Sequence, residues 1–191
     1  MGLGLPTGGG GDFVTYCKYN AKAGRWYTKD DSGDEYEIEK FKAYFDFKNI
    51  QTGIFKFEAG QAPEKIFDTE VGAGDAVGEG NFKRGFLLNV FSPKIGGLRE
   101  FSSTAGAVNN EMNTLYDEYL KSDEGKAGKL PLVECVKVNP VDSKHGTNYA
   151  PELKITKWGD RPKEFDELAA TPAPTPAPTP ASSDDAVEDW D

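Results

Sequence analysis

Histidine and cysteine are scarce in this sequence, and their scarcity argues against several kinds of chemistry. His145 is the only histidine, which leaves no basis for a histidine-based catalytic triad or a multi-histidine metal site. Cys17 and Cys135 are too few for a disulfide scaffold and have no metal-ligand spacing. No run approaches the roughly 20 apolar residues of a membrane span. We therefore expect a cytoplasmic protein that is not an enzyme and uses no metal or cofactor.

Phosphate-binding and calcium-binding motifs are also missing. The glycines at Gly8–Gly11 are not followed by the Lys-Ser/Thr pair that grips a phosphate. Acidic residues gather most densely in the body at 30–35, but this cluster lacks the length and the final glutamate of a calcium loop. The segment is best interpreted as a solvated hairpin turn, with a divalent-ion site as the less favoured alternative.

The charge of the chain is unevenly distributed. The net charge is −10, which by itself argues against a nucleic-acid partner. However, residues 164–191 hold eight of the 32 acidic residues and none of the 22 basic ones, so this stretch alone carries −8. Residues 1–163 are close to neutral, and such a body can still present a basic face.

Composition divides the chain into four parts. Residues 1–11 form a Gly-rich arm that we expect to be flexible, and residues 12–163 contain the apolar and aromatic segments of a folded domain. Residues 164–181 are an acidic and Pro-rich linker, in which the Thr-Pro and Ala-Pro repeats favour an extended spacer. Residues 182–191 form an acidic tail tip with a single tryptophan, which we expect to be disordered.

The order of predicted elements indicates a mainly β protein. Segments rich in strand-forming residues occur at 13–19, 25–28, 35–38, 41–48, 54–57, 83–91, 98–101, 132–138 and 149–158. One amphipathic helix follows the capping residues at 102–104. Several strands, one helix and two further strands match an OB-fold, a five-stranded barrel, here with extra hairpins. An α+β sheet covered by one helix remains an alternative.

The segment Phe41–Lys48 shows the clearest alternation in the chain. Its odd-numbered residues are apolar and its even-numbered residues are polar or aromatic. Because side chains alternate between the two faces of a strand, we expect the odd-numbered face to be buried and the other to be wet. The segment Glu58–Gly80, in contrast, is rich in Gly, Pro and acids and indicates an irregular loop.

Aromatic and basic residues are interleaved in two segments, Tyr16–Tyr27 and Lys42–Lys48. Proteins that bind single strands stack bases on aromatic rings while Lys and Arg follow the phosphates. Carbohydrate-binding and peptide-binding modules also carry such strands, and rings of this kind also fill the cores of small barrels. The candidate DNA-binding residues are Tyr19, Lys22, Arg25, Trp26, Tyr27, Lys42, Tyr44, Lys48, Lys83, Arg84, Lys94, Arg99 and Lys144.

The layout of the chain resembles that of single-stranded DNA-binding proteins of bacteria and their phages. In the body, the resemblance rests on Tyr19–Tyr27, Phe91–Lys94, Arg99–Ser103 and Lys144–Tyr149. In the tail it rests on the acidic tip, although this tip ends in Trp-Asp rather than in the aromatic residue itself. The resemblance implies an OB-fold that coats DNA during phage replication or recombination, without catalysis.

In such proteins the tip acts as a decoy and a hook. Its carboxylates imitate a phosphate chain and its tryptophan imitates a stacked base. The tip then occupies the protein's own groove until DNA displaces it, and docks on replication or recombination proteins. The residues expected to bind such partners are Asp184, Asp185, Glu188, Asp189, Trp190 and Asp191.

A protein from another class is the main alternative. A non-catalytic phage accessory protein that binds a host protein, or an acidic mimic of DNA, would also explain the low pI of about 4.7. The sequence leaves the oligomeric state open, including a homo-oligomer, and gives no DNA site size.

Overall fold

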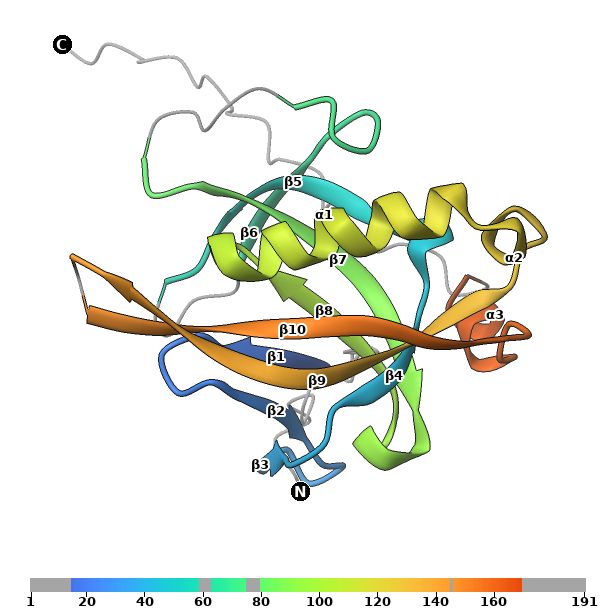
Figure 1. Cartoon of the computed structure of the whole chain (residues 1–191), viewed down its shortest axis with the longest axis horizontal. Coiled ribbons are helices and arrows are strands. Elements are labelled where there is room, and N and C mark those ends of the chain that lie inside the picture. Colours follow the sequence, from blue (N-terminus) through green and yellow to red (C-terminus); the bar gives the residue numbers. More distant parts are fainter. Residues whose placement is uncertain (1–14, 59–62, 75–79, 145, 170–191) are drawn as a thin grey trace, which may run out of the picture.

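The computed structural model describes residues 15–58, 63–74, 80–144 and 146–169. The Gly-rich arm at 1–11, His145 and the acidic tip at 182–191 lie outside the described residues. Within the described ranges the protein is mainly β with one main helix, which confirms the prediction at this level (Figure 1).

Ten strands of the described residues belong to one mixed sheet. They are β1 (Tyr16–Asn20), β2 (Arg25–Lys29), β3 (Glu35–Ile38), β4 (Lys42–Phe45), β5 (Gln51–Lys56), β6 (Glu64–Phe67), β7 (Lys83–Ser92), β8 (Gly97–Ser103), β9 (Leu130–Ser143) and β10 (Gly146–Gly159). The helices are α1 (Gly106–Lys121), α2 (Asp123–Lys126) and α3 (Glu164–Ala169), with 3-10 turns η1 (Phe47–Asn49) and η2 (Pro93–Ile95).

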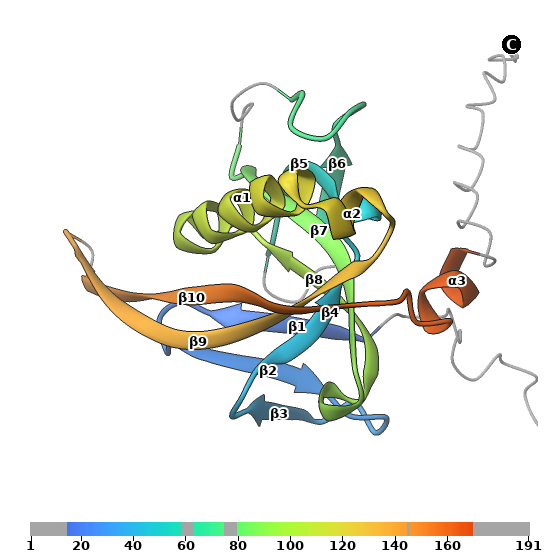
Figure 2. The same ribbon diagram turned by 45° about the vertical axis from the view of Figure 1, so that its right-hand side comes forward.

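The sheet curls into a half-barrel. Its strand order is β10-β9-β4-β7-β8-β1-β2-β3, with β5 paired to β7 and to β6. All of these pairs are antiparallel except β1 with β8, which are parallel. Figure 2 shows α1 lying across one side of the curled sheet, next to β10.

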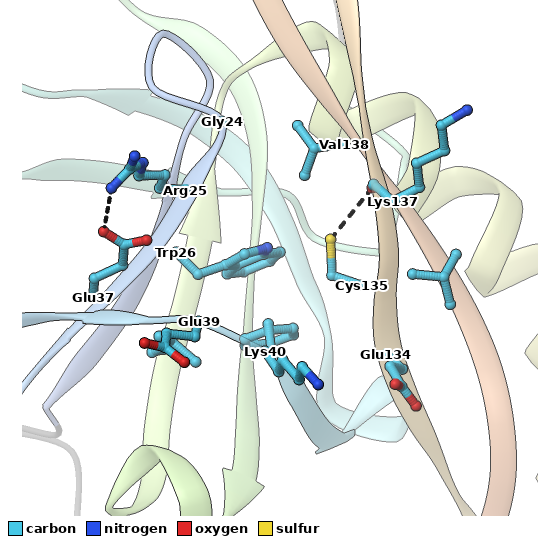
Figure 3. Close-up of a pocket in the computed structure, with 13 residues that line it drawn as sticks. Gly24, Arg25, Trp26, Glu37, Glu39, Lys40, Glu134, Cys135, Lys137 and Val138 are labelled. Atoms are coloured by element: carbon cyan, nitrogen blue, oxygen red, sulfur yellow. Dashed lines mark hydrogen bonds and ion pairs between the residues drawn. The ribbon is translucent and has the colours of Figure 1, made fainter.

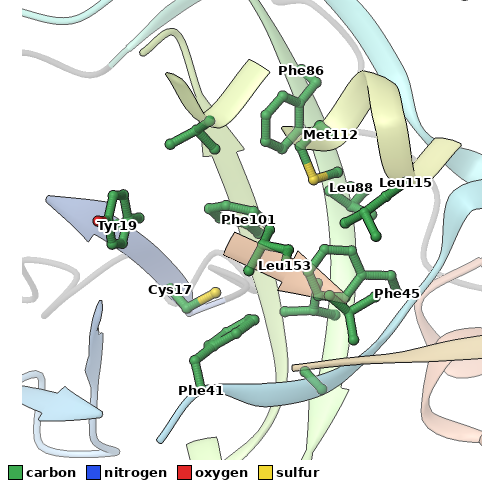
Figure 4. Close-up of a cluster of buried hydrophobic side chains, with 14 of the residues drawn as sticks. Cys17, Tyr19, Phe41, Phe45, Phe86, Leu88, Phe101, Met112, Leu115 and Leu153 are labelled. Atoms are coloured by element: carbon green, nitrogen blue, oxygen red, sulfur yellow. The ribbon is translucent and has the colours of Figure 1, made fainter. Parts of the chain in front are cut away.

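The concave side of the sheet holds a core rich in aromatic rings (Figure 4). Phe41, Ala43, Phe45 and Phe47 are all buried, which confirms the inward face predicted for this segment. The prediction of a wet opposite face is wrong for Asp46, which is 2% exposed because Arg161 and Asn49 donate hydrogen bonds to its carboxylate. The ring of Phe41 stacks on Trp26 at 3.7 Å between centroids, with 9° between the planes. The residue just before β4 therefore packs directly against β2 across the half-barrel.

Helix α1 closes the core from the side of β10. Val108, Met112, Leu115 and Tyr119 are buried on one stripe, as the periodicity predicts. The helix begins one residue after Ala105, which makes no side-chain cap, so none of the predicted capping residues at 102–104 is the N-cap. No helix within the described residues has both the length and the apolar character needed to cross a membrane.

Strands β9 and β10 form a long two-stranded ribbon that extends well into the segment 139–148, between the predicted strands at 132–138 and 149–158. The Tyr149 N–H points away from β9 and donates to Ala21 O at 2.7 Å. Tyr149 is opposite Pro140, so the nitrogen of Pro140 faces the other outer edge of the ribbon. Pro151 lies two residues from Tyr149 on β10, so its backbone nitrogen points to the same outer edge as the Tyr149 N–H. Each outer edge of the ribbon thus carries a proline without an N–H group.

The folded body continues into the segment that composition assigns to the linker. Phe165 of α3 is only 2% exposed and packs edge-on against Phe91 at 6.2 Å. Arg161 donates two hydrogen bonds to the buried carboxylate of Asp46, at 2.7 and 2.8 Å, and one to Asp166 at 2.9 Å. Together these contacts, which we call the C-terminal clasp, hold residues 161–166 against β7 and against Asp46, which follows β4.

The segment Glu58–Gly80 is more ordered in its described parts than its composition predicts. It contains β6, which pairs with β5. Asp68 follows β6 and accepts hydrogen bonds from Arg84 and from the hydroxyl of Thr52. The Arg84 guanidinium lowers the pKa of Asp68 to about 2, with a smaller contribution in the same direction from Thr52.

Candidate nucleic-acid interface

The outer face of the β1–β2 hairpin combines rings and cations. Cys17, Tyr19, Trp26 and Thr28 point into the core, so the alternate residues of both strands point outward. These outward residues are Tyr16 and Lys18 on β1 and Tyr27 and Lys29 on β2, and none of them is buried. We call this set the tyrosine-lysine face.

The tyrosine-lysine face alternates along both strands and across them. Lys18 and Tyr27 are direct cross-strand neighbours. The Lys18 ammonium lies 5.8 Å from the ring centre of Tyr16 and 5.7 Å from that of Tyr27. Lys29 lies 5.4 Å from the ring centre of Tyr16. Each ring therefore has an ammonium group beside it, within cation–π distance.

Carboxylates border this face and partly neutralise it. Glu35 of β3 accepts from Lys18 at 2.6 Å and from the Tyr16 hydroxyl at 3.1 Å. Its pKa is lowered, mainly by the hydrogen bond from Lys18. At the end of the same outer row, Arg25 pairs with Glu37 at 2.6 Å. A phosphate bound here would have to displace these carboxylates from Lys18 and Arg25.

A pocket of about 340 Å³ lies beside Tyr16, between β1, β8 and the β5–β6 hairpin. Phe57, which is 51% exposed, and Lys65 form part of its wall, with the hydroxyls of Ser102 and Ser103. Lys65 pairs with Glu100 at 2.6 Å. The pocket extends the tyrosine-lysine face with another aromatic ring, another cation and small polar groups.

Two of the predicted stacking rings belong to the core. Trp26 is 3% exposed and Tyr19 is 8% exposed, and the Tyr19 hydroxyl donates to Tyr149 O at 3.0 Å. Burial raises the pKa of Tyr19 to about 12. Their rings pack against other core rings and present no face to a base in solution.

Other predicted contacts are committed to the protein itself. Arg99 is 5% exposed and donates to Thr28 Oγ1 and to the carbonyls of Leu98 and Lys29. Arg84 is bound to Asp68, and Lys42 pairs with Glu134 at 3.0 Å. Tyr44 lies against the end of β10, where a Cβ on Gly159 would come within 2.7 Å of its ring.

The remaining predicted residues are accessible but scattered. Of the thirteen candidates, only Tyr27 belongs to the tyrosine-lysine face, and Arg25 continues its outer row. The other exposed candidates lie in turns or at strand ends, and they are Lys22, Lys48, Lys83, Lys94 and Lys144. The candidate tail residues, Asp184 to Asp191, fall outside the described residues.

Tyr16 and Lys18 lie in the predicted aromatic-basic segment but not among the thirteen candidate residues, and Lys29 lies just beyond that segment. The charges near Tyr19 and Trp26 suggested exposure, whereas strict alternation from Cys17 and Thr28 would have assigned those two rings to the buried side. Phe57 and Lys65 carried no local signal, because β6 was not predicted and the pocket depends on its pairing with β5.

The acidic cluster at 30–35 forms the β2–β3 turn. Asp30 accepts hydrogen bonds from the backbone N–H groups of Ser32 and Asp34, both at 2.9 Å. Among the described residues no group of three or more His, Cys, Asp or Glu side chains is arranged to hold a metal ion. The geometry at this turn agrees with the hairpin interpretation.

No protein-family model, curated protein or solved structure matches this chain.

Proposed function

We propose that the protein binds single-stranded DNA along the tyrosine-lysine face, without catalysis, and coats it during DNA replication or recombination. The observation that carries the proposal is the alternation of outward-pointing, half-buried rings and ammonium groups along β1 and β2, with Lys18 between Tyr16 and Tyr27. Bases stack on such rings regardless of sequence, while the cations follow the phosphates.

The pairing of the strands supports an OB-like arrangement as part of this proposal. β4 and β5 flank η1 and both pair with β7, so together they act as one bent strand. β7 and β8 form the next hairpin, α1 stands between β8 and β9, and β9 with β10 forms the last hairpin. β4 also pairs with β9, as a Greek-key barrel requires.

One feature distinguishes this arrangement from a closed five-stranded barrel. The free side of β8 is occupied by β1, in parallel, so the β1–β2–β3 meander takes the position at which the last strand would close the barrel. OB-folds bind oligonucleotides on their second and third strands and on the loop between their first two strands. Here these are β7, β8 and the segment containing β6, which border the pocket at Tyr16.

The tail has a proposed role as well. The carboxylates and Trp190 between Asp184 and Asp191 would compete with DNA for this face and dock on replication or recombination proteins. Because the competition is electrostatic, it should weaken at high salt.

A gel-shift with oligo-dT at low and high salt tests the proposal. Replacing Tyr16 or Tyr27 by Ala should weaken binding by about 1–3 kcal/mol for each lost stack, because each ring contributes one stacking surface. Tyr36→Ala is the control, since Tyr36 is an exposed tyrosine on β3 that lies opposite the inward-facing Thr28 and so outside the tyrosine-lysine face. Equal affinities for all three variants would remove this face from the DNA path.

The alternative function is an acidic module that binds a host protein or mimics DNA. Its structural support is the border of carboxylates, Glu35, Glu37 and Glu100, which already pair with Lys18, Arg25 and Lys65. A protein of this kind would shift no oligo-dT at any salt concentration. A DNA-coating protein should instead bind tightly at low salt and lose affinity steeply as salt rises.

A further inference from the structure

A second pocket, of about 450 Å³, opens where the sheet fails to close (Figure 3). β3 ends the strand order, and β9 pairs with β4 through only three residues before Cys135 N donates to Phe41 O. We call this opening between the β2–β3 hairpin and β9 the seam pocket. It is lined by residues 24–26, 37–41 and 134–138.

The floor of the seam pocket contains a buried polar group without a good partner. The Trp26 ring is stacked on Phe41, and among the described residues its buried indole nitrogen has no acceptor in good hydrogen-bond geometry, with only a weak interaction with the Cys135 thiol. Figure 3 shows this nitrogen directed across the pocket toward Cys135. Burial raises the pKa of the Cys135 thiol, and the nearby indole N–H only partly opposes that effect. A neutral thiol is a weak acceptor, so the buried N–H lacks a good partner.

The rim of the pocket carries two cations that are not paired. Arg25 is bound to Glu37, and Glu134 is bound to Lys42. Lys40 and Lys137 are exposed and form no ion pair with any described residue, whereas Glu39 is the one lining carboxylate without such a pair. The charged side chains of the lining, three basic and three acidic, sum to zero, but Glu37 and Glu134 are bound to Arg25 and to Lys42 outside the lining, which leaves the two lysines accessible at the rim.

The seam pocket lies at the end of the outer row of β2. This row runs from Lys29 through Tyr27 to Arg25, and Arg25 is itself part of the pocket wall. A single strand that follows the tyrosine-lysine face to its end would therefore meet the pocket wall at Arg25.

We infer that the seam pocket takes one nucleobase of the bound single strand, with an acceptor of the base receiving the Trp26 N–H, an inference that rests on the proposed function. The volume lies in the range of ligand pockets, about 300–1,000 Å³, and is far larger than the about 30 Å³ of a single water. Lys40 and Lys137 hold the flanking phosphates. Thymine suits the pocket because O2 and O4 are both acceptors.

Trp26→Phe tests the hydrogen bond, because it keeps an aromatic ring on Phe41 and removes the N–H. Its affinity for oligo-dT should fall roughly 3- to 10-fold, the range expected for one neutral hydrogen bond. Trp158→Phe is the matched control, since Trp158 lies near Tyr119 and away from the pocket lining, and its affinity should not change.

Alkylation of Cys135 reports occupancy in the unmodified protein, so the test does not depend on the folding of a variant. Cys135 lines the seam pocket, while Cys17 is 1% exposed and serves as an internal unreactive thiol. With a maleimide and mass spectrometry, saturating oligo-dT should slow the labelling of Cys135.

The outcomes distinguish a failure of this binding site from a failure of the proposed function. If the unmodified protein binds no oligo-dT, the proposed function fails and the site with it. If it binds oligo-dT while Cys135 labels at an unchanged rate, the site alone is overturned, whatever the affinity of Trp26→Phe. Protection of Cys135 with an unchanged Trp26→Phe affinity overturns the assigned hydrogen bond.

Discussion

The C-terminal clasp gives the sharpest test of stability. Replacing Arg161 by Ala removes both of its hydrogen bonds to Asp46, whose side chain is 2% exposed. The carboxylate would keep only one side-chain donor among the described residues, the amide of Asn49 at 2.8 Å. A buried charge is then left almost uncompensated, and the folded state should lose stability.

The expected magnitude follows from these contacts. Breaking a buried ion pair by removing one side costs about 3–5 kcal/mol. Arg161 is itself 23% exposed, so water can partly replace it, which favours the lower end of the range. Loss of the contact between Arg161 and the Phe165 ring, at 5.1 Å, adds about 0.5 kcal/mol. We expect a loss of about 3 kcal/mol, or roughly 6–12 °C in Tm for a domain of this size.

Urea and thermal denaturation, followed by circular dichroism, measure this effect. The double variant Asp46→Asn with Arg161→Ala should recover part of the loss, because the buried charge disappears together with its partner. Lys163→Ala is the control, since Lys163 is an exposed neighbour on the same segment and its loss should stay within about 0.5 kcal/mol. An Arg161→Ala variant as stable as this control would refute the reasoning.

Three further predictions concern other parts of the protein. The pKa of Asp68 is lowered to about 2, so its pairing with Arg84 stabilises the fold at pH values above the unfolded pKa of 3.8. As the pH falls from about 4 to 2, the free energy of unfolding should decrease by on the order of 1 kcal/mol after solvent screening, which an acid titration of unfolding measures. Asp68→Asn should abolish that decrease. Gly24→Ala should destabilise the protein by about 1 kcal/mol or more in urea, because Gly24 has φ of +67° and a Cβ there would lie 3.0 Å from Tyr149; a neutral result would mean that the turn relaxes freely. Deleting residues 184–191 should tighten oligo-dT binding, because the tail no longer competes with DNA for the tyrosine-lysine face. An unchanged affinity in a salt-series gel-shift would remove the decoy role.

Sequence patterns predicted the fold best where one strand was buried on a single face. The alternation from Phe41 to Phe47 identified four core residues correctly, because hydrophobic burial selects one face of a strand. The same principle assigns Trp26 to the core with Thr28, whereas the charged residues beside Trp26 in the sequence favour an exposed position. Local charge is a poor guide to exposure when the charged side chains point to the opposite face.

The elements that were missed depend on contacts between distant parts of the chain. β6 exists through its pairing with β5, and α3 is held by Arg161 on Asp46, a pair of residues 115 positions apart. Likewise the parallel pairing of β1 with β8, which leaves the seam open beside β9, has no sequence signature of its own. Pairings of this kind cannot be read from one sequence.

The prolines of the β9–β10 ribbon limit the pairing of its outer edges with strands of neighbouring molecules. When many copies of a protein lie side by side on DNA, unpaired strand edges of neighbouring copies tend to form hydrogen bonds with one another and make a continuous sheet. Pro140 and Pro151 each interrupt the row of donors on one outer edge of the ribbon. If the protein coats DNA as proposed, neighbouring molecules could lie close together on one strand without their ribbon edges pairing into one sheet.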